Sequence, residues 1–242
     1  MPLLDLDAEL AEKLTEAELA EARPHVVGDL HRVRRGTWDP PPERPLAVLV
    51  LDGPLLLQRT IASSTGVELL GDGDIVLLGR DGAAPGFLEV DTTWLALDEA
   101  KVICLDDRFG RALRQWPKLG VEVMERTEQR TERVVTLNAI SQHVRVDTRV
   151  LLALWYLSER WGHVTPDGVL LEVALTHRML ASVVGARRPS VTTAISQLQR
   201  TGRLERRDEG WLLLGAPPDV DGTLVAGPWS TSAVDGGPSL AG

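Results

Sequence analysis

The chain has 242 residues, enough for two modest domains, and its composition is 43% hydrophobic and 25% charged with a net charge of −9. No apolar run reaches the length of a membrane span, and the acidic start, MPLLDLDAELAEKL, lacks the features of a signal peptide. A single cysteine, Cys104, excludes an intrachain disulfide, and the scattered histidines lack metal-ligand spacing. We therefore expect a cytoplasmic protein without membrane contact, metal site or cofactor.

Charge is unevenly distributed along the chain. Residues 176–207 carry seven arginines and one acid, Glu205, although the protein as a whole is acidic. A compact basic segment of this kind is typical of a protein in which one module binds nucleic acid phosphates. A solvated basic face without a partner explains the same pattern, so charge alone leaves both interpretations open.

The first half of the chain changes from a helical to a strand-like pattern. Residues 7–22 contain no Gly or Pro and are rich in Ala, Leu and Glu, which predicts one short amphipathic helix. From about residue 25 to 105, short apolar runs alternate with turn residues, which predicts an antiparallel sandwich or barrel. The predicted strands include residues 46–51, 55–57, 67–70 and 75–78. Asp52-Gly53 is typical of a tight hairpin turn, and Cys104 is expected in the core.

Helices are predicted after residue 105. Residues 106–116 form the first, and Pro117 can begin the next, which continues over Lys118–Ser141. The middle turns of this second helix, residues 125–133, are wholly polar, so it cannot be a core helix of one domain along its whole length. We expect it to pack partly on its own domain and partly on a symmetry-related copy. A third helix, residues 147–161, is expected to end at Gly162 in a left-handed cap.

The C-terminal pattern is a helix, a short turn, a second helix and a β-hairpin, at residues 176–184, 185–188, 189–201 and 203–214. Apolar positions at helical spacing can hold the two helices in one small core. The opposite face of the second helix carries short polar side chains that can approach bases and phosphates, and Arg188 can bind guanine with two hydrogen bonds. The residues expected to bind DNA are Thr176, Arg187, Arg188, Ser190, Thr192, Thr193, Gln197, Arg206 and Arg207. A generic helix pair without DNA binding is the alternative.

These segments also resemble a known family. The run LTHRMLASVVGARRPSVTTAISQLQRTGRLERRDEGWLLL is similar to the winged helix-turn-helix of the CRP/FNR family of bacterial regulators. The runs LAVLVLDGPLLL and VELLGDGDIV are similar to the family's β-roll of the cyclic-nucleotide-binding type. The resemblance implies an α+β fold with an N-terminal antiparallel, jelly-roll-like β-roll sensor, a long dimerisation helix and a C-terminal winged helix-turn-helix.

The expected domains follow from the pattern and the resemblance together. They are a sensor domain over residues 1–105, a dimerisation region over 106–145, a DNA-binding domain over 146–216 and a disordered tail over 217–242, which is rich in Gly, Pro, Ser and Asp. The resemblance implies a homodimeric transcription regulator on pseudo-palindromic double-stranded DNA. RNA polymerase and an unidentified small-molecule effector are further expected partners. No catalytic constellation stands out, so we do not expect an enzyme.

The sensor departs from the pattern of family members that bind cyclic AMP. Those members have a Gly-Glu pair where this chain has Leu77-Leu78, and they pair an Arg with the cyclic phosphate where it has Asp91. An aspartate would repel the phosphate, so control by cyclic AMP is not expected. The candidate residues for a pocket that binds another effector are Leu77, Leu78, Asp91, Thr92 and Thr93.

Two alternatives remain open beside a regulator that cyclic AMP does not control. One is a small-molecule or protein-interaction sensor whose DNA-binding unit has degenerated. The other is a cyclic-nucleotide-responsive regulator, which Asp91 disfavours. In the second helix of the basic segment, Pro189 and Thr193 replace a Glu and an Arg of the family, so the expected operator differs from that of the founding member.

Overall fold

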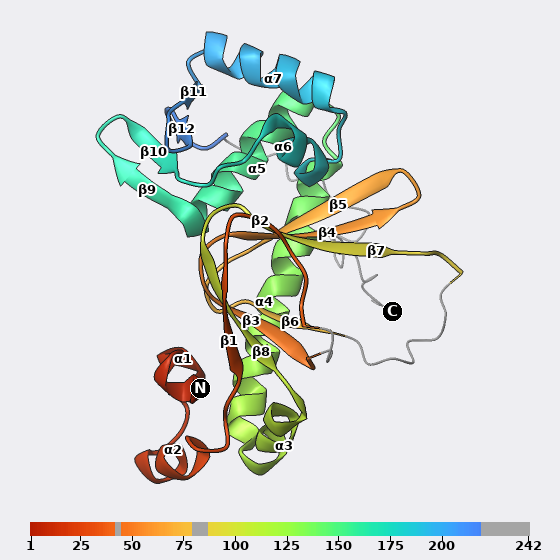
Figure 1. Ribbon diagram of the computed structural model, residues 1–242. Coiled ribbons are helices and arrows are strands. Elements are labelled where there is room, and N and C mark those ends of the chain that lie inside the picture. The colour runs from red at the N-terminus through yellow and green to blue at the C-terminus, as the bar shows by residue number, and fades with distance from the viewer. Residues whose placement is uncertain (42–44, 79–86, 219–242) are drawn as a thin grey trace, which may run out of the picture.

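The computed structural model describes residues 1–41, 45–78 and 87–218. A long helix, α4 (Pro117–Ser141), runs beside the β-sheets of the N-terminal half toward a smaller, largely helical C-terminal unit (Figure 1). The predicted α+β architecture is confirmed. The tail predicted over residues 217–242 lies outside the described residues from position 219 onward. In the described ranges, no helix combines the length and the apolar character needed to cross a membrane.

The N-terminal segment forms two short helices, so the prediction of one helix over residues 7–22 was wrong. A 3-10 turn, η1 (Leu3–Asp5), precedes α1 (Ala8–Ala11) and α2 (Glu16–Ala22). Asp7 caps α1 by accepting a hydrogen bond from the amide of Leu10. Thr15 has extended backbone and forms a capping box with Glu18, which starts a new helix there. Helix propensity alone did not reveal this internal start.

Two four-stranded antiparallel sheets follow, and they confirm the predicted sandwich. The first has the order β1 (Asp29–Val33), β8 (Ala100–Leu105), β3 (Ala47–Asp52) and β6 (Ile75–Leu77). The second has the order β2 (Gly36–Trp38), β7 (Asp91–Ala96), β4 (Leu55–Ile61) and β5 (Ser64–Leu70). Val48 and Val50 face the core between the sheets, whereas Ala47 and Leu49 pack against the covering helices. The continuous apolar run of β3 thus reflects burial on both faces. Cys104 is buried, as expected.

The Asp52-Gly53 turn does not form the expected hairpin. It connects β3 to β4, and these strands belong to different sheets. Gly53 has a φ of +89°, and a Cβ atom at this position would lie 2.4 Å from the carbonyl oxygen of Glu99. The glycine is therefore required for a close backbone approach where the chain changes sheets. A local turn signal cannot distinguish that crossing from a hairpin.

Two helices connect the sandwich to the C-terminal unit, and a third begins that unit. They are α3 (Asp107–Gln115), α4, which Pro117 opens, and α5 (Val146–Trp161), all close to their predicted bounds. The expected left-handed cap at Gly162 was wrong, because this residue has extended backbone with φ of −97° and ψ of 148°. The chain passes directly from α5 into a strand, β9 (Gly162–Thr165).

The C-terminal unit has the predicted helix-turn-helix and hairpin. Strand β10 (Gly168–Leu171) precedes α6 (His177–Val183), α7 (Arg188–Arg200), β11 (Leu204–Arg206) and β12 (Trp211–Leu213), and the strands form a sheet in the order β11, β12, β10, β9. Gly185 adopts a φ of +60° in the turn between α6 and α7, which suits glycine. The predicted apolar positions of the two helices are buried: Leu180, Val183, Val184, Val191, Ile195 and Leu198.

The C-terminal core continues into the sandwich. Leu56, Leu69 and Leu97 of the sandwich are buried in the same apolar cluster as Val150 and Leu154 of α5. The two halves of the chain are therefore packed against each other.

Candidate DNA-binding surface

One face of α7 is exposed and polar, whereas the other is buried. Ser190, Thr192 and Thr193 are exposed, and Gln197 is half-buried. The hydroxyl of Thr192 donates to the carbonyl oxygen of Arg188 at 3.1 Å, and that of Thr193 donates to Pro189 at the same distance. These bonds fold the short side chains against the helix backbone. The result is a low surface that a large, flat partner can approach closely.

Arg187 and Arg188 lie where α7 begins. Arg187 occupies the N-cap position with extended backbone, and no side chain caps the helix there. Both arginines are exposed, and within the described part of the chain neither forms an ion pair. Thr176 holds the corresponding position before α6, where its hydroxyl accepts a hydrogen bond from the amide of Met179 at 3.3 Å. The charged side chains of Arg187 and Arg188 therefore lie beside the uncapped backbone N–H groups at the exposed start of α7.

The β11–β12 hairpin carries Arg206 and Arg207, which the structure places in different surroundings. The guanidinium of Arg206 lies 4.7 Å from the ring centre of Trp211, a cation–π arrangement. Trp211 is itself fixed, because it is buried and its indole N–H donates to the carbonyl oxygen of Leu175 at 3.1 Å. Arg207 instead pairs with Glu205 at 3.1 Å. Trp211 therefore holds the guanidinium of Arg206 in one direction, whereas the carboxylate of Glu205 partly neutralises the charge of Arg207.

His177 connects these elements, and sequence reasoning missed it. Its Nδ1 lies 3.1 Å from the hydroxyl oxygen of Thr192 on α7. Its ring stacks on Trp211 of β12, with centroids 5.9 Å apart and planes 29° apart. Burial lowers the pKa of His177, and the charges of Arg188 and Arg206 lower it further. The available signal was its place, directly after the N-cap Thr176 and inside the basic segment.

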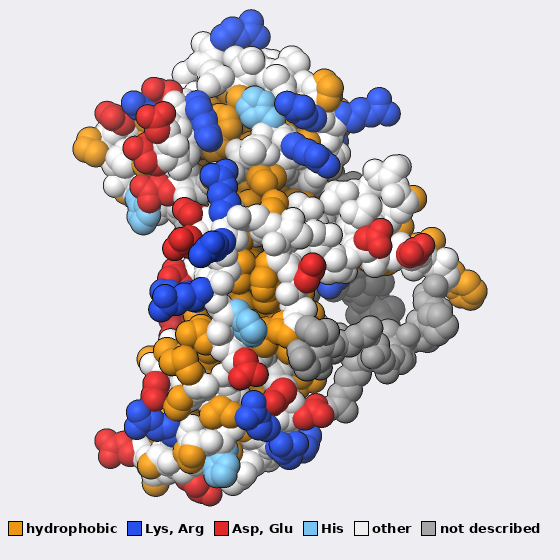
Figure 2. All heavy atoms as spheres, viewed as in Figure 1, with side chains coloured by type: hydrophobic (Ala, Val, Ile, Leu, Met, Phe, Trp, Pro, Cys, Tyr) orange, Lys and Arg blue, Asp and Glu red, His pale blue; other side chains and the backbone are white. Residues whose placement is uncertain are grey.

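Basic side chains are prominent over this end of the molecule. Figure 2 shows Lys and Arg side chains over the helix-turn-helix end, whereas Asp and Glu gather in this view on the side formed by β9 and β10. The distribution separates a basic face around α6 and α7 from an acidic flank.

The effector-pocket candidates lie on two different sheets. Leu77 is on β6 of the first sheet, whereas Asp91, Thr92 and Thr93 are on β7 of the second. The side chains of Leu77, Asp91 and Thr92 are exposed, and those of Leu78 and Thr93 are half-buried. Residues 79–86, which connect the two groups, lie outside the described ranges. A cavity of about 420 Å³ lies elsewhere, between the β4–β5 hairpin, α4 and α6, and includes Arg59, Glu68, Asn138 and Ser182 in its lining.

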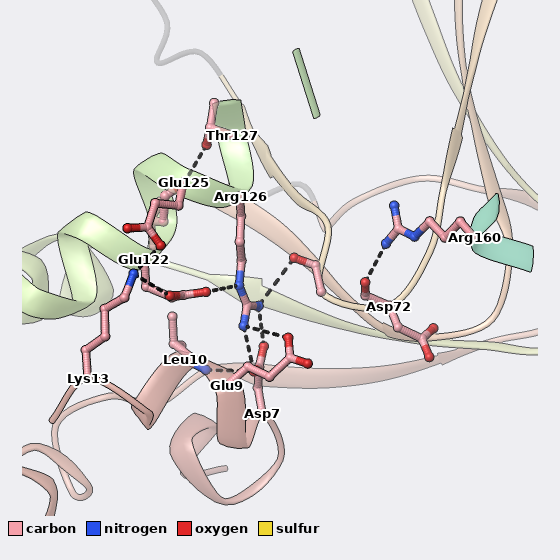
Figure 3. Close-up of polar contacts among 12 residues, drawn as sticks. Asp7, Glu9, Leu10, Lys13, Asp72, Glu122, Glu125, Arg126, Thr127 and Arg160 are labelled. Atoms are coloured by element: carbon pink, nitrogen blue, oxygen red, sulfur yellow. Dashed lines mark hydrogen bonds and ion pairs between the residues drawn. The ribbon is translucent and has the colours of Figure 1, made fainter. Parts of the chain in front are cut away.

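The polar turns of α4 bind the N-terminal half of the same chain. Arg126 is buried, and its guanidinium donates to both carboxylate oxygens of Asp7, at 2.6 and 2.9 Å, and to Glu122 at 2.9 Å (Figure 3). Burial by itself lowers the pKa of Arg126, but its bonds to Asp7 and Glu122 raise it overall. Arg130 pairs with Glu68 of β5 through two hydrogen bonds of 2.6 and 2.7 Å. The middle turns of α4 therefore pack on its own chain through ion pairs, which agrees with the first part of the expectation.

The buried carboxylate of Asp74 connects α4, α5 and the loop before β6. Asp74 accepts hydrogen bonds from Arg133 of α4, from Arg160 of α5 at 2.8 Å and from the amide of Gly71 at 2.9 Å. Arg160 also donates to the carbonyl oxygen of Asp72 at 2.5 Å, a contact drawn in Figure 3. The loop before β6 is thereby tied to the first helix of the C-terminal unit.

Comparison with known proteins shows what the C-terminal helix-turn-helix is similar to. The model of the Crp-like helix-turn-helix domain matches residues 148–215. These residues form a Crp-like helix-turn-helix domain. Regulatory protein CysR of Synechococcus elongatus is 26% identical over 156 residues, which cover 63% of this chain and 71% of CysR.

Two further similar proteins match different shares of the chain. A protein of Porphyra purpurea, ycf28, named as an HTH-type transcriptional regulator, is 28% identical over 107 residues. That match covers 44% of this chain and less than half, 45%, of ycf28. The structure of a CooA mutant from Carboxydothermus hydrogenoformans has the same fold, with a TM-score of 0.63 and 18% identity over 85% of this chain and 89% of CooA.

Proposed function

We propose that this protein regulates transcription by binding a pseudo-palindromic site on double-stranded DNA as a two-fold dimer, without control by cyclic AMP. The observation that carries the proposal is the exposed start of α7, where Arg187 and Arg188 stand unpaired above a low polar face. A helix with this character fits the major groove of B-DNA. In this arrangement Arg188 reads a base edge, and Arg206 on the hairpin binds a neighbouring phosphate.

The proposed dimer forms through α4. Val121, Met124 and Val135 are exposed on this helix, and they lie three and eleven residues apart, which places them on one side of it. Leu119 and Val123 are buried against the sandwich and represent the opposite side. An apolar stripe of this kind is covered when two copies of the helix pack around a two-fold axis. The same axis would place two α7 helices on half-sites about 34–36 Å apart, one turn of DNA.

The proposed regulation excludes cyclic AMP because of Asp91. Its side chain is exposed at the start of β7, at the position that the family resemblance assigns to the phosphate-pairing Arg. A carboxylate there repels a cyclic phosphate and supplies no charge-assisted hydrogen bond. An effector of another class, or the amount of protein alone, is the proposed control, and RNA polymerase is the proposed partner at the promoter.

Selection of DNA fragments by the purified protein, followed by sequencing, tests the function. We expect an enriched motif with two-fold symmetry and half-sites one helical turn apart. A gel shift with the DNA upstream of the protein's own gene is the companion measurement. Recovery of fragments without a shared motif would contradict the proposal and favour a sensor whose DNA-binding unit has degenerated.

A further inference from the structure

His177 lies where three parts of the candidate DNA-binding surface meet. It is the first residue of α6, it contacts Thr192 on the exposed face of α7, and it stacks on Trp211 of β12. Arg206 contacts the same Trp211 ring from β11. The imidazole therefore occupies the middle of the surface that the proposed function assigns to DNA.

The charged groups around His177 are cations. Arg188 of α7 and Arg206 of β11 act on it electrostatically, and Arg178 follows it on its own helix. Strand β12, Trp211–Leu213, carries no charged residue. The nearby acid of β11, Glu205, is paired with Arg207. In the free protein these cations and the partial burial of the ring favour the neutral imidazole.

Bound DNA instead favours the protonated form of the His177 imidazole. Each phosphate carries a negative charge, and phosphates bound by Arg188 and Arg206 would lie beside the imidazole as well. The contact to Thr192 uses Nδ1, which leaves Nε2 as the nitrogen that can donate to a phosphate once the ring is protonated. We propose that His177 binds a DNA backbone phosphate as an imidazolium, so that DNA binding takes up a proton at this residue. This inference rests on the proposed DNA-binding function.

The sign of the pH dependence follows from linkage. The pKa of His177 is lower in the free protein and higher in the complex, because the phosphate stabilises the charged form. DNA affinity therefore rises as the pH falls through the pKa of the complex, and it levels off below the pKa of the free protein. The total gain is about tenfold for each unit by which DNA raises that pKa.

The test compares DNA affinity across pH for the full chain and two single variants. His177→Gln keeps a side chain that can donate a hydrogen bond but cannot titrate in this range. His163→Gln is the matched control, because His163 is an exposed histidine of the same C-terminal unit that pairs with Glu172 at 3.3 Å. The probes are a duplex of the selected motif and a duplex of scrambled sequence, each measured at constant ionic strength from about pH 8.5 to about pH 6.

We expect the wild-type protein and the His163→Gln variant to gain about three- to tenfold in affinity toward low pH, beyond any gain of the His177→Gln variant. The extra gain should occur on both duplexes, since a phosphate contact does not read sequence. An equal pH dependence of the His177→Gln and wild-type proteins would overturn the assignment even if both bind DNA tightly. Failure of the wild-type protein to prefer the selected duplex at any pH would overturn the proposed function itself, which is a distinguishable result.

The imidazole resonances of His177 give a direct second measurement. Their titration should shift to higher pH when the scrambled duplex is added, whereas those of His163 should not move. A pKa of His177 that DNA leaves unchanged would also overturn the proposal. This readout separates a phosphate contact from a purely structural role in stacking on Trp211, because stacking alone predicts no shift.

Discussion

Replacing Asp7 by asparagine should lower the free energy of unfolding by about 3 kcal/mol, because it leaves a buried guanidinium without its main partner. The side chains of Arg126 and Asp7 are 7% and 8% exposed, and two hydrogen bonds join them. Removal of one partner from a buried ion pair typically destabilises a protein by about 3–5 kcal/mol. The lower end applies here, since Glu122 still accepts from Arg126 at 2.9 Å.

The substitution separates the ion pair from the helix cap. Asp7 also accepts the amide hydrogen bond of Leu10 at 3.0 Å, and an asparagine oxygen can accept the same bond. Asp5→Asn is the matched control two residues away, because Asp5 pairs with Arg23 on the surface, where the side chains are 39% and 59% exposed. We expect this control to change stability by less than about 1 kcal/mol.

Urea unfolding, monitored by circular dichroism, measures both variants. The double variant with Asp7→Asn and Arg126→Met should recover much of the loss, because it buries no unpaired charge. Two results would refute the reasoning: a loss for Asp7→Asn no larger than that of Asp5→Asn, or a double variant that is no more stable than Asp7→Asn alone.

The remaining predictions concern DNA, the dimer and cyclic nucleotides. Arg188→Ala should reduce affinity for the selected site by about 1–3 kcal/mol and relax preference at one base pair per half-site, and an equal loss on scrambled DNA would refute base reading. Arg206→Ala and Arg207→Ala should weaken binding to both sequences and lower the salt slope by about one each, with the larger loss for Arg206, which Trp211 orients. Met124→Lys should convert the proposed dimer to a folded monomer in sedimentation, since Met124 is 72% exposed in the single chain. Calorimetry should detect no micromolar binding of cyclic AMP or cyclic GMP, and such binding would show that Asp91 does not occupy the phosphate position.

Local signals in the sequence predicted most elements of the fold. Pro117 and Gly185 mark a helix start and an interhelical turn where the structure has them, because both act through their own backbone geometry. Gly162 and Asp52-Gly53 were misread, because the same residue types also serve strand entry and a change of sheet. Whether a glycine caps a helix, opens a strand or lets the chain change sheets depends on the distant segment against which its backbone packs.

The candidate site was predictable where it follows helical periodicity. The exposed face of α7 lies opposite its buried apolar positions, as the spacing predicts. His177 was missed because its neighbours, Thr192 and Trp211, come from other elements. The intrachain partners of the polar turns of α4 could not be predicted for the same reason, since those of Arg126 and Arg130 lie 119 and 62 residues away in the chain.

The shared core of Leu56, Leu69 and Leu97 with α5 has a thermodynamic consequence. Two units joined only by a linker melt independently, whereas these three leucines would enter water if the C-terminal unit separated or unfolded first. Calorimetry of the intact chain should therefore record one cooperative transition, and a fragment cut before α5 should expose an apolar patch and bind hydrophobic dyes. A signal that reorients the C-terminal unit must supply enough differential binding energy to offset the separation of these side chains.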